Sequence, residues 1–288
     1  GVFRNRICFP KRNFKKGIGV KQKNNLRVLS LGAGVQSTTL ALMIEHKLIK
    51  PIDFAVFADT KHETDDTYKH LEFLIKKCSF PIKIVCAGDL LEDTFKKNID
   101  IPFHIMDQGK GAIIRRQCTN TYKIKPVYQE IRKALKLKKG ERIKKGISVD
   151  LLMGISLDEI VRTKTNPIKW FKNTYPLIDV KMRRSDCKKW LQDNNYIIPP
   201  RSACWFCPYN SKDRWIDLKK NYPNYFTKAI ELDERIRNYK GSYNTINDTA
   251  KLFLHSRKKP LKDIDLENKN PDQMEFSELD ECEGVCFI

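Results

Sequence analysis

The stretch "NNLRVLSLGAGVQSTTLALMIEHK", from Asn24 to Lys47, decides the fold of this chain. Apolar residues lead into a loop of small residues, the loop closes on Ser and Thr hydroxyls, and an apolar segment of helical length follows. A strand, a glycine-containing loop and a helix in this order bring backbone N–H groups and the positive end of a helix dipole around an anion. The loop fits neither the G-x-x-x-x-G-K-[ST] nor the G-x-G-x-x-G pattern. The stretch therefore predicts a phosphate-binding loop of another kind.

The alternation of apolar strand and helix continues beyond this stretch. Strands are expected at 26–31, 52–59, 82–88 and 149–156, and helices at 38–47, 65–77, 90–98 and 125–137. Strands at this spacing, separated by helices, indicate an α/β fold with a doubly wound, mostly parallel sheet and right-handed crossovers. Ligands of such sheets bind at the carboxyl ends of the strands. The loops 30–37, 59–63 and 154–162 are therefore expected to converge on one site.

The pattern divides the chain into three regions. Residues 1–25 contain no Asp or Glu and form a basic arm, residues 26–180 carry the α/β pattern, and residues 181–288 are helical and loop-rich, with a C-x-x-C motif and a cysteine-containing tail. The arm is interpreted as a nucleic-acid contact, as the remnant of an organelle-targeting segment, or as a frayed terminus.

The composition indicates a basic protein of a reducing compartment. Lys and Arg number 55 against 35 Asp and Glu, which gives a net charge of +20 at pH 7. This charge favours a nucleic-acid partner, RNA rather than DNA, either as substrate or within a ribonucleoprotein complex; a lysine-rich solvated surface is the alternative. Nine cysteines are too few for a disulfide scaffold. We expect an intracellular location, cytoplasmic or, if the arm is a processed targeting segment, mitochondrial or otherwise organellar.

A membrane location is not expected from the sequence. No apolar run approaches the roughly 20 residues that a membrane-spanning helix requires. The chain is therefore expected to be soluble and to have no membrane partner.

Several motifs in order resemble those of a known superfamily. Residues 32–37 occupy the place of the S-G-G-x-D-S loop of the PP-loop ATP pyrophosphatases, with Gly32 for its serine, Ala33 for its first glycine and Gln36 for its aspartate. The segments "FADTKHETDDTY", "RRQCTNTYKIKPV", "GISLDEIVRT", "YPLID" and "SACWFCP" follow. Together they resemble the phosphoadenosine phosphosulfate reductase-like family, which includes nucleic-acid sulfurtransferases, from about residue 26 to 208. The resemblance implies an adenine nucleotide alpha hydrolase-like fold.

The resemblance also implies a nucleotide site. The ligand would be ATP or an adenylyl-sulfate, and Lys123 and Arg162 would neutralise its phosphate or sulfate oxygens. For Arg162 the alternative is a surface ion pair with Asp158 or Glu159. The residues expected to bind the nucleotide are Ser30, Gly32, Ala33, Gly34, Gln36, Ser37, Thr38, Phe57, Asp59, Thr60 and Gly154.

The cysteines suggest a metal centre, because a C-x-x-C motif with a distant third cysteine is a metal-ligand pattern. By resemblance, Cys118, Cys204 and Cys207 would hold a [4Fe–4S] cluster. Gln117 stands where the family has the first of two adjacent cysteines, so Cys187 becomes the candidate fourth ligand. The alternatives are a three-cysteine cluster whose open iron carries a sulfide, as the resemblance to tRNA thiolases of the superfamily implies, a tetrahedral zinc site, and merely buried thiols.

The C-terminal "ECEGVCFI" is similar to the catalytic E-C-G motif of the reductases. Cys282 is placed like the catalytic thiol, and Cys286 would be its resolving partner, unless both reach a metal. A tail with two ordinary thiols is the alternative.

Three functions follow from these observations. The first is an ATP-dependent sulfurtransferase that acts on nucleic acid through an adenylated intermediate. The second is an adenylyl-sulfate reductase. The third is a non-catalytic, basic RNA-binding or ribonucleoprotein subunit that has kept the fold. The phosphate loop, the cysteines and the charge together favour the first, an enzyme.

Overall fold

A computed structural model describes residues 25–96, 101–138, 140–239 and 246–267 of the chain. Its main sheet has five parallel strands in the order β3-β2-β1-β6-β7. The strands are β1 (Asn25–Leu31), β2 (Phe54–Asp59), β3 (Ile82–Cys86), β6 (Ser148–Met153) and β7 (Phe171–Thr174). The expected α/β fold with a mostly parallel sheet is confirmed.

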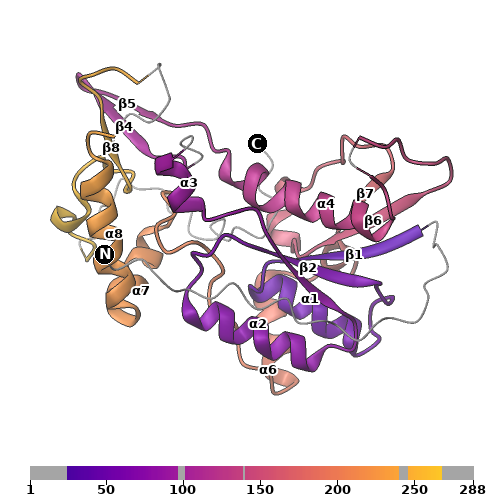
Figure 1. Cartoon of the computed structure of the whole chain (residues 1–288). Coiled ribbons are helices and arrows are strands. Elements are labelled where there is room, and N and C mark those ends of the chain that lie inside the picture. Colours follow the sequence, from indigo (N-terminus) through magenta and orange to yellow (C-terminus); the bar gives the residue numbers. More distant parts are fainter. Residues whose placement is uncertain (1–24, 97–100, 139, 240–245, 268–288) are drawn as a thin grey trace.

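Helices cover both faces of this sheet (Figure 1). The helices α1 (Val35–Glu45), α2 (Asp65–Lys77) and α6 (Arg184–Asp193) pack on one face, and α4 (Lys125–Ala134) packs on the other. Side chains alternate along a strand, so Leu29 and Leu31 of β1 contribute to the core with α1, whereas Val28 contributes to the core with α4. Both faces of the strands are buried, and this explains their nearly continuous apolar sequence.

The chain reverses its direction of travel across the sheet at β1. From β1 it moves through β2 to β3 at one edge, and later it returns to the other side of β1 as β6 and β7. In open α/β sheets such a reversal leaves a crevice outside the carboxyl ends of the two central strands, and ligands bind there. The loop after β1 and the loop after β6 border this crevice.

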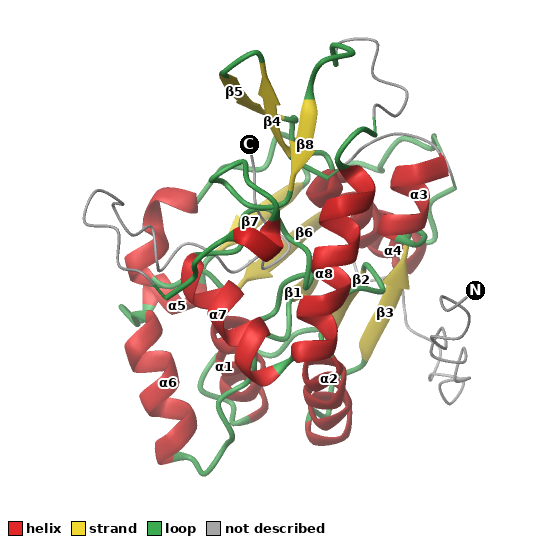
Figure 2. Ribbon diagram, turned by 90° about the vertical axis from the view of Figure 1, so that its left-hand side faces the viewer, coloured by secondary structure: helices red, strands yellow, loops and turns green. Residues whose placement is uncertain are grey.

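A second sheet and a second core form beside the first. The strands β4 (His104–Asp107), β5 (Lys110–Ile113) and β8 (Lys251–Phe253) pair antiparallel in the order β5-β4-β8. The helices α3 (Leu90–Lys96), α7 (Lys212–Asn221) and α8 (Pro223–Ile236) contribute to this core, together with the short 3₁₀ helix Leu261–Asp263. Figure 2 shows this small sheet beyond the carboxyl side of the main one. The sequence pattern did not predict these strands.

Short helical turns complete the main domain. A π-helix at Thr119–Ile124 leads directly into α4, a 3₁₀ helix at Leu157–Arg162 follows β6, and α5 (Pro176–Asp179) precedes α6. These turns carry Lys123, Glu159 and Arg162 toward the carboxyl edge of the sheet. They are the local elements that position the candidate site.

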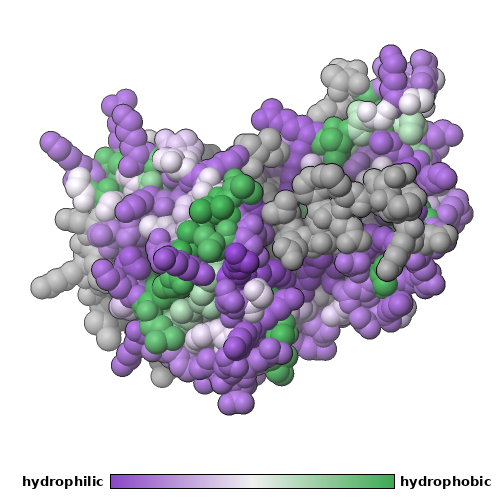
Figure 3. Space-filling model, turned by 180° about the vertical axis from the view of Figure 1, so that it is seen from behind, coloured by the Kyte–Doolittle hydropathy of each residue, from purple (hydrophilic) through white to green (hydrophobic). Residues whose placement is uncertain are grey.

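The surface is mainly hydrophilic on the side opposite to the view of Figure 1. On the face seen in Figure 3, hydrophilic side chains predominate and one band of apolar side chains crosses them. Within the described ranges, no helix has both the length and the apolar character that crossing a bilayer requires. Most of the expected basic arm and the candidate thiols Cys282 and Cys286 lie outside the described residues.

Candidate functional site

The loop after β1 folds back on itself through a few specific bonds. Ala33 adopts a left-handed conformation with φ of 61°, which bends the chain into the first turn of α1. The N–H of Gly32 donates to the hydroxyl of Ser37 at 3.3 Å, and the N–H of Thr38 donates to the carbonyl of Gly34 at 3.0 Å. The predicted loop therefore forms, with the hydroxyl of Ser37 inside it.

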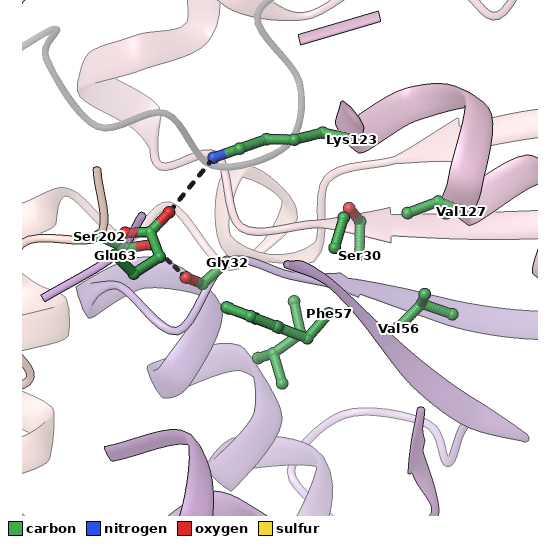
Figure 4. A pocket seen from close by; sticks show the side chains of 10 residues that line it. Ser30, Gly32, Val56, Phe57, Glu63, Lys123, Val127 and Ser202 are labelled. Carbon is green, nitrogen blue, oxygen red and sulfur yellow. Dashed lines mark hydrogen bonds and ion pairs between the residues drawn. The ribbon is translucent and has the colours of Figure 1, made fainter. Parts of the chain in front are cut away.

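A small pocket opens beside this loop (Figure 4). Its cavity volume is about 10 Å³, about the size of one water molecule, within about 280 Å³ of empty space that includes open solvent. Ser30 from the end of β1, Gly32 from the loop, Phe57 from β2 and Lys123 from the π-helix line it, as do Leu31, Val56, Ala58, Glu63, Val127 and Ser202. Ser30, Gly32, Phe57 and Lys123 were predicted as site residues from the sequence. The pocket is apolar over the strands and polar at the loop.

An ion pair lies at the polar end of the pocket. The ammonium of Lys123 is 3.7 Å from a carboxylate oxygen of Glu63, and the two side chains are only 8% and 1% exposed. Figure 4 shows Lys123 extending across the pocket toward Glu63. A charge buried in this way is expensive to maintain unless it is paired, so each group depends on the other.

The C-x-x-C motif forms a turn that packs against the loop and the end of β2. The N–H of Cys207 donates to the carbonyl of Cys204 at 3.0 Å, and the N–H of Trp205 donates to the carbonyl of His62 at 3.1 Å. The hydroxyl of Ser202 donates to the carbonyl of Gly32. The structure thus brings the cysteine segment into contact with the loop after β1, although the two contacting residues are 170 positions apart in the sequence.

Cys204 is the most enclosed thiol of this turn. Its sulfur lies 3.2 Å from the hydroxyl of Thr60. Burial raises the pKa of the Cys204 thiol well above its ordinary value, the nearby Glu63 carboxylate raises that pKa further, and the Lys123 ammonium lowers it. In the structure described, Cys204 is therefore a thiol rather than a thiolate at neutral pH.

Asp59, at the end of β2, is held by the residues that follow it. Its carboxylate accepts a hydrogen bond from the N–H of Lys61 at 2.7 Å and from the hydroxyl of Tyr68 at 2.8 Å. Burial, together with the Asp59 and Glu63 carboxylates, raises the pKa of Tyr68. The loop after β2 is thereby fixed against α2, with Thr60 and Glu63 directed toward the site.

The cysteines do not assemble into the predicted four-ligand centre. Cys118 and Cys207 are partly buried against the same core as Cys204, whereas Cys187 is fully buried in the core with α1, and its carbonyl accepts from Thr39 at 3.4 Å. Among the described residues, no group of three or more His, Cys, Asp or Glu side chains is placed to hold a metal ion. Neither the [4Fe–4S] cluster nor the zinc alternative is supported by the described residues.

Gln36, in the first turn of α1, contacts the 3₁₀ helix that follows β6. This helix carries Glu159 and Arg162. The amide of Gln36 donates to Glu159 at 3.1 Å and to Ser156 at 3.4 Å, and its oxygen accepts from Arg184 at 2.6 Å. Arg162 pairs with the second oxygen of Glu159 at 2.5 Å. The ion pair considered as the alternative for Arg162 is thus present, and it is largely buried.

The remaining predicted binding residues have mixed surroundings. The hydroxyl of Thr38 contacts His70 of α2 at 2.9 Å, so it lies toward the helix layer. Gly154 is buried where β6 ends, and Gly34 caps the start of α1. Thr60 contacts Cys204, as described above. None of these residues lines the pocket, and their role in binding stays a prediction.

Three residues of the site were missed as binding residues in the sequence. Glu63 follows the second strand and was included only as the end of a loop, while Ser202 looked like an ordinary residue before the C-x-x-C motif. Arg184 stands in the basic run "KMRR", where surface exposure was the simplest expectation. Only Glu63 could have been recognised from the sequence, because it is an acidic residue four positions after the carboxyl end of β2.

A solved reductase structure is similar to part of this chain. The chain is similar to a phosphoadenylyl-sulfate reductase from Candida auris, solved in complex with phosphate, with 14% sequence identity and a TM-score of 0.40. The similarity covers 62% of this chain and 75% of that one. No protein-family model and no curated protein matches the sequence. What the chain binds therefore has to be inferred from the residues around the pocket.

Proposed function

We propose that this chain is a PP-loop protein of the phosphoadenosine phosphosulfate reductase-like kind, and that it uses an adenosine nucleotide to transfer sulfur to a nucleic acid. One observation carries the proposal. Ser202 of the cysteine segment donates its hydrogen bond to Gly32 of the phosphate-type loop. This contact joins the loop proposed to bind the nucleotide to the turn that carries the thiols, and it supports a shared site.

The residues that line the pocket offer the kinds of contact that an adenosine nucleotide makes, and a base enters only if the pocket widens. Phe57, Val56 and Val127 offer an apolar surface for a base, and Ser30 offers a polar contact at its edge. The ammonium of Lys123 and the backbone N–H groups of the loop are suited to phosphate oxygens. The nucleotide would lie with its base over β1 and β2 and its phosphates at the loop.

The proposed reaction has two steps: adenylation of the nucleic acid, and displacement of AMP by sulfur. An oxygen of the nucleic acid attacks the α-phosphorus of ATP, and pyrophosphate leaves with the electron pair of the broken bond. Hydrosulfide, supplied by a separate donor, then attacks the activated carbon, the bond between that carbon and the AMP oxygen breaks, and AMP leaves with the electron pair while the sulfur stays on the nucleic acid. Lys123 would balance the charge on the phosphates during the first step. The thiol of Cys204, 3.2 Å from Thr60, would lie beside the site of the second step.

The partner is proposed from the charge of the whole chain. The net charge of +20 favours binding of a polyanion, because contacts to phosphates release counterions. RNA is the first candidate, and DNA is the second.

The test measures nucleotide turnover by the full-length chain. Purified protein is incubated with ATP and sodium hydrosulfide, and AMP and pyrophosphate are quantified with and without added RNA or DNA. We expect production that nucleic acid stimulates and that Lys123→Ala lowers by about a hundredfold or more, as for loss of a charge that stabilises a transition state. Lys188→Ala, at an exposed position on α6, is the matched control and keeps the activity.

Other outcomes would assign a different function. Release of sulfite from adenylyl-sulfate, indifferent to nucleic acid, would identify a reductase. Salt-sensitive nucleic-acid binding without any nucleotide turnover would identify a non-catalytic subunit. Absence of nucleotide binding altogether would remove the proposal.

A further inference from the structure

We propose that the loop between α4 and β6 is a binding surface for the phosphate backbone of a nucleic acid, separate from the candidate site. This basic loop consists of residues 136–138 and 140–145, which contain five Lys or Arg side chains and one acid. The role deepens the proposed function and rests on it for the class of the partner.

The positive side chains of the basic loop are open to solvent. All five are exposed, and they are Lys136, Lys138, Arg142, Lys144 and Lys145. Among the described residues, no carboxylate forms an ion pair with any of them. Their charges are therefore available to an anionic partner.

The acids close to the basic loop are engaged elsewhere. The carboxylate of Glu141, the one acid of the loop, accepts a hydrogen bond from the backbone N–H of Lys138 at 2.7 Å. Glu130 of α4 pairs with Lys83 of β3 at 3.0 Å. Five positive charges against one negative leave the loop with a net charge of +4. A surface of this sign attracts phosphate groups and gains counterion entropy when it binds them.

The backbone of the basic loop is held in place by the rest of the domain. The guanidinium of Arg132 donates to the carbonyls of Lys138 and Glu141, at 2.9 and 2.7 Å. Leu137 and Ile143 pack against the core between α4 and the sheet. The lysines therefore extend from a fixed backbone, and less conformational freedom is lost when a partner binds them.

The basic loop lies at the amino-terminal edge of the main sheet. Ser148, which follows it and begins β6, aligns with Asn25 at the start of β1, and its hydroxyl donates to the Asn25 side chain at 3.0 Å. Residues 1–24, which have eight Lys or Arg and no acid, join the chain at Asn25. Lys169, also exposed, precedes β7 at this edge. The basic arm is therefore attached beside the basic loop, and the two extend one region of positive charge.

This position separates the surface from the candidate site. Figure 1 shows the start of β1 at the end of the main sheet away from the second sheet, whereas the site lies at the carboxyl edge. A strand of six residues, such as β6, spans about 20 Å at roughly 3.3 Å per residue. A nucleic acid held at both places must extend at least that far, which is about six nucleotides at roughly 3.4 Å each. Lysines contact phosphates without reading bases, so this surface anchors the partner and does not select its sequence.

The test is fluorescence anisotropy of the full-length chain with a labelled RNA hairpin and a labelled DNA duplex, at several salt concentrations. The loop variant carries Lys136→Gln, Arg142→Gln and Lys144→Gln together. We expect it to bind both probes about tenfold or more weakly than the wild type, whatever their sequence. The slope of log affinity against log salt should fall in magnitude by about 2 to 3, because three phosphate contacts are lost.

The control variant removes three positive charges from another part of the surface. It carries Lys188→Gln, Lys189→Gln and Lys219→Gln, all at exposed positions on α6 and α7. Its net charge equals that of the loop variant, and it should keep the affinity and the salt slope of the wild type. Circular dichroism and thermal unfolding show that both variants are folded.

Two outcomes would overturn the proposed surface whatever the reaction is. If both triple variants weaken RNA and DNA equally, binding follows the total charge of the chain and not the basic loop. If vesicles that contain phosphatidylserine bind the wild type more tightly than the hairpin does, and the loop variant loses this binding, the loop faces a lipid surface.

The same measurements separate this surface from the proposed function. If the loop variant loses RNA binding while the wild type produces no AMP from ATP, the surface stands and the proposed function fails. If RNA stimulates AMP production and the loop variant binds RNA like the wild type, the proposed function stands and the surface is wrong. If the wild type binds neither RNA nor DNA, both fail.

Discussion

The hydroxyl of Thr60 lies 3.2 Å from the sulfur of Cys204, two residues that are 144 positions apart in the chain. Thr60 follows β2, and Cys204 opens the C-x-x-C turn, so this contact joins the carboxyl edge of the sheet to the second core. The thiol is buried, and burial raises its pKa. Its reactivity therefore reports directly on the state of the site.

Cys204 is expected to react slowly with alkylating agents, because the thiolate is the reactive form and burial disfavours it. At pH 8, iodoacetamide should label the exposed Cys86 before Cys204, as measured by mass spectrometry of digested peptides over time. Bound ATP should slow the labelling of Cys204 further and leave Cys86 unchanged. Equal rates for the two thiols would contradict the burial of Cys204.

The pair of Lys123 and Glu63 is expected to be coupled in stability. Removing one partner of a buried ion pair leaves a buried charge and costs about 3 kcal/mol or more. Lys123→Met alone should therefore lower the free energy of unfolding by that order. Lys123→Met with Glu63→Gln should recover part of the loss, because the buried carboxylate is then gone.

This coupling is measured by urea unfolding of the wild type, both single variants and the double variant. The coupling energy is the departure of the double variant from the sum of the single ones. If the losses in the free energy of unfolding are purely additive, the ion pair of Lys123 and Glu63, whose charged groups are 3.7 Å apart, does not stabilise the fold.

The parallel sheet was predictable because its signals are local. Each of its first three strands is an apolar run followed by a helix, and α2 also carries Asp65 and Asp66 at its start and Lys76 and Lys77 at its end, which complement the helix dipole. The convergence of the loops 30–37, 59–63 and 154–162 was predictable because the carboxyl ends of parallel strands lie at one edge of the sheet. The placement of Lys123 at the pocket followed only from the family resemblance.

The second sheet was not predictable in the same way. Its strands have three or four residues, too few for a clear alternation, and β8 pairs with β4 from more than 140 residues away. The turn between β4 and β5 carried a usable signal, since Gln108 and Gly109 both have positive φ. The contacts of Arg184 and Ser202 depend on the tertiary structure, so the sequence shows neither.

Ser202 is expected to hold the cysteine segment against the loop. Ser202→Ala removes the hydroxyl that donates to the carbonyl of Gly32 and leaves that buried oxygen with one bond fewer. The expected loss is about 1 kcal/mol in the free energy of unfolding, together with weaker ATP binding. Ser185→Ala, at an exposed position on α6, is the control and should change neither quantity. Unchanged ATP affinity in Ser202→Ala would show that the contact does not shape the nucleotide site.

Acid is expected to destabilise the fold through two buried histidines. Burial lowers the pKa of His70, which contacts Thr38, and of His255 from the usual 6.5 to about 4. Between these values the unfolded chain binds protons that the folded chain does not, so the free energy of unfolding falls as the pH is lowered from about 6.5 to 4. Each histidine accounts for a loss of about 3 kcal/mol at the acid end of this range, by conversion of the pKa difference. Urea unfolding at a series of pH values measures the slope, and His70→Gln should make it shallower, because His255 and His104, whose pKa values burial also lowers, then remain. A slope in this range that is unchanged by the substitution would show that His70 takes up its proton equally well in the folded protein.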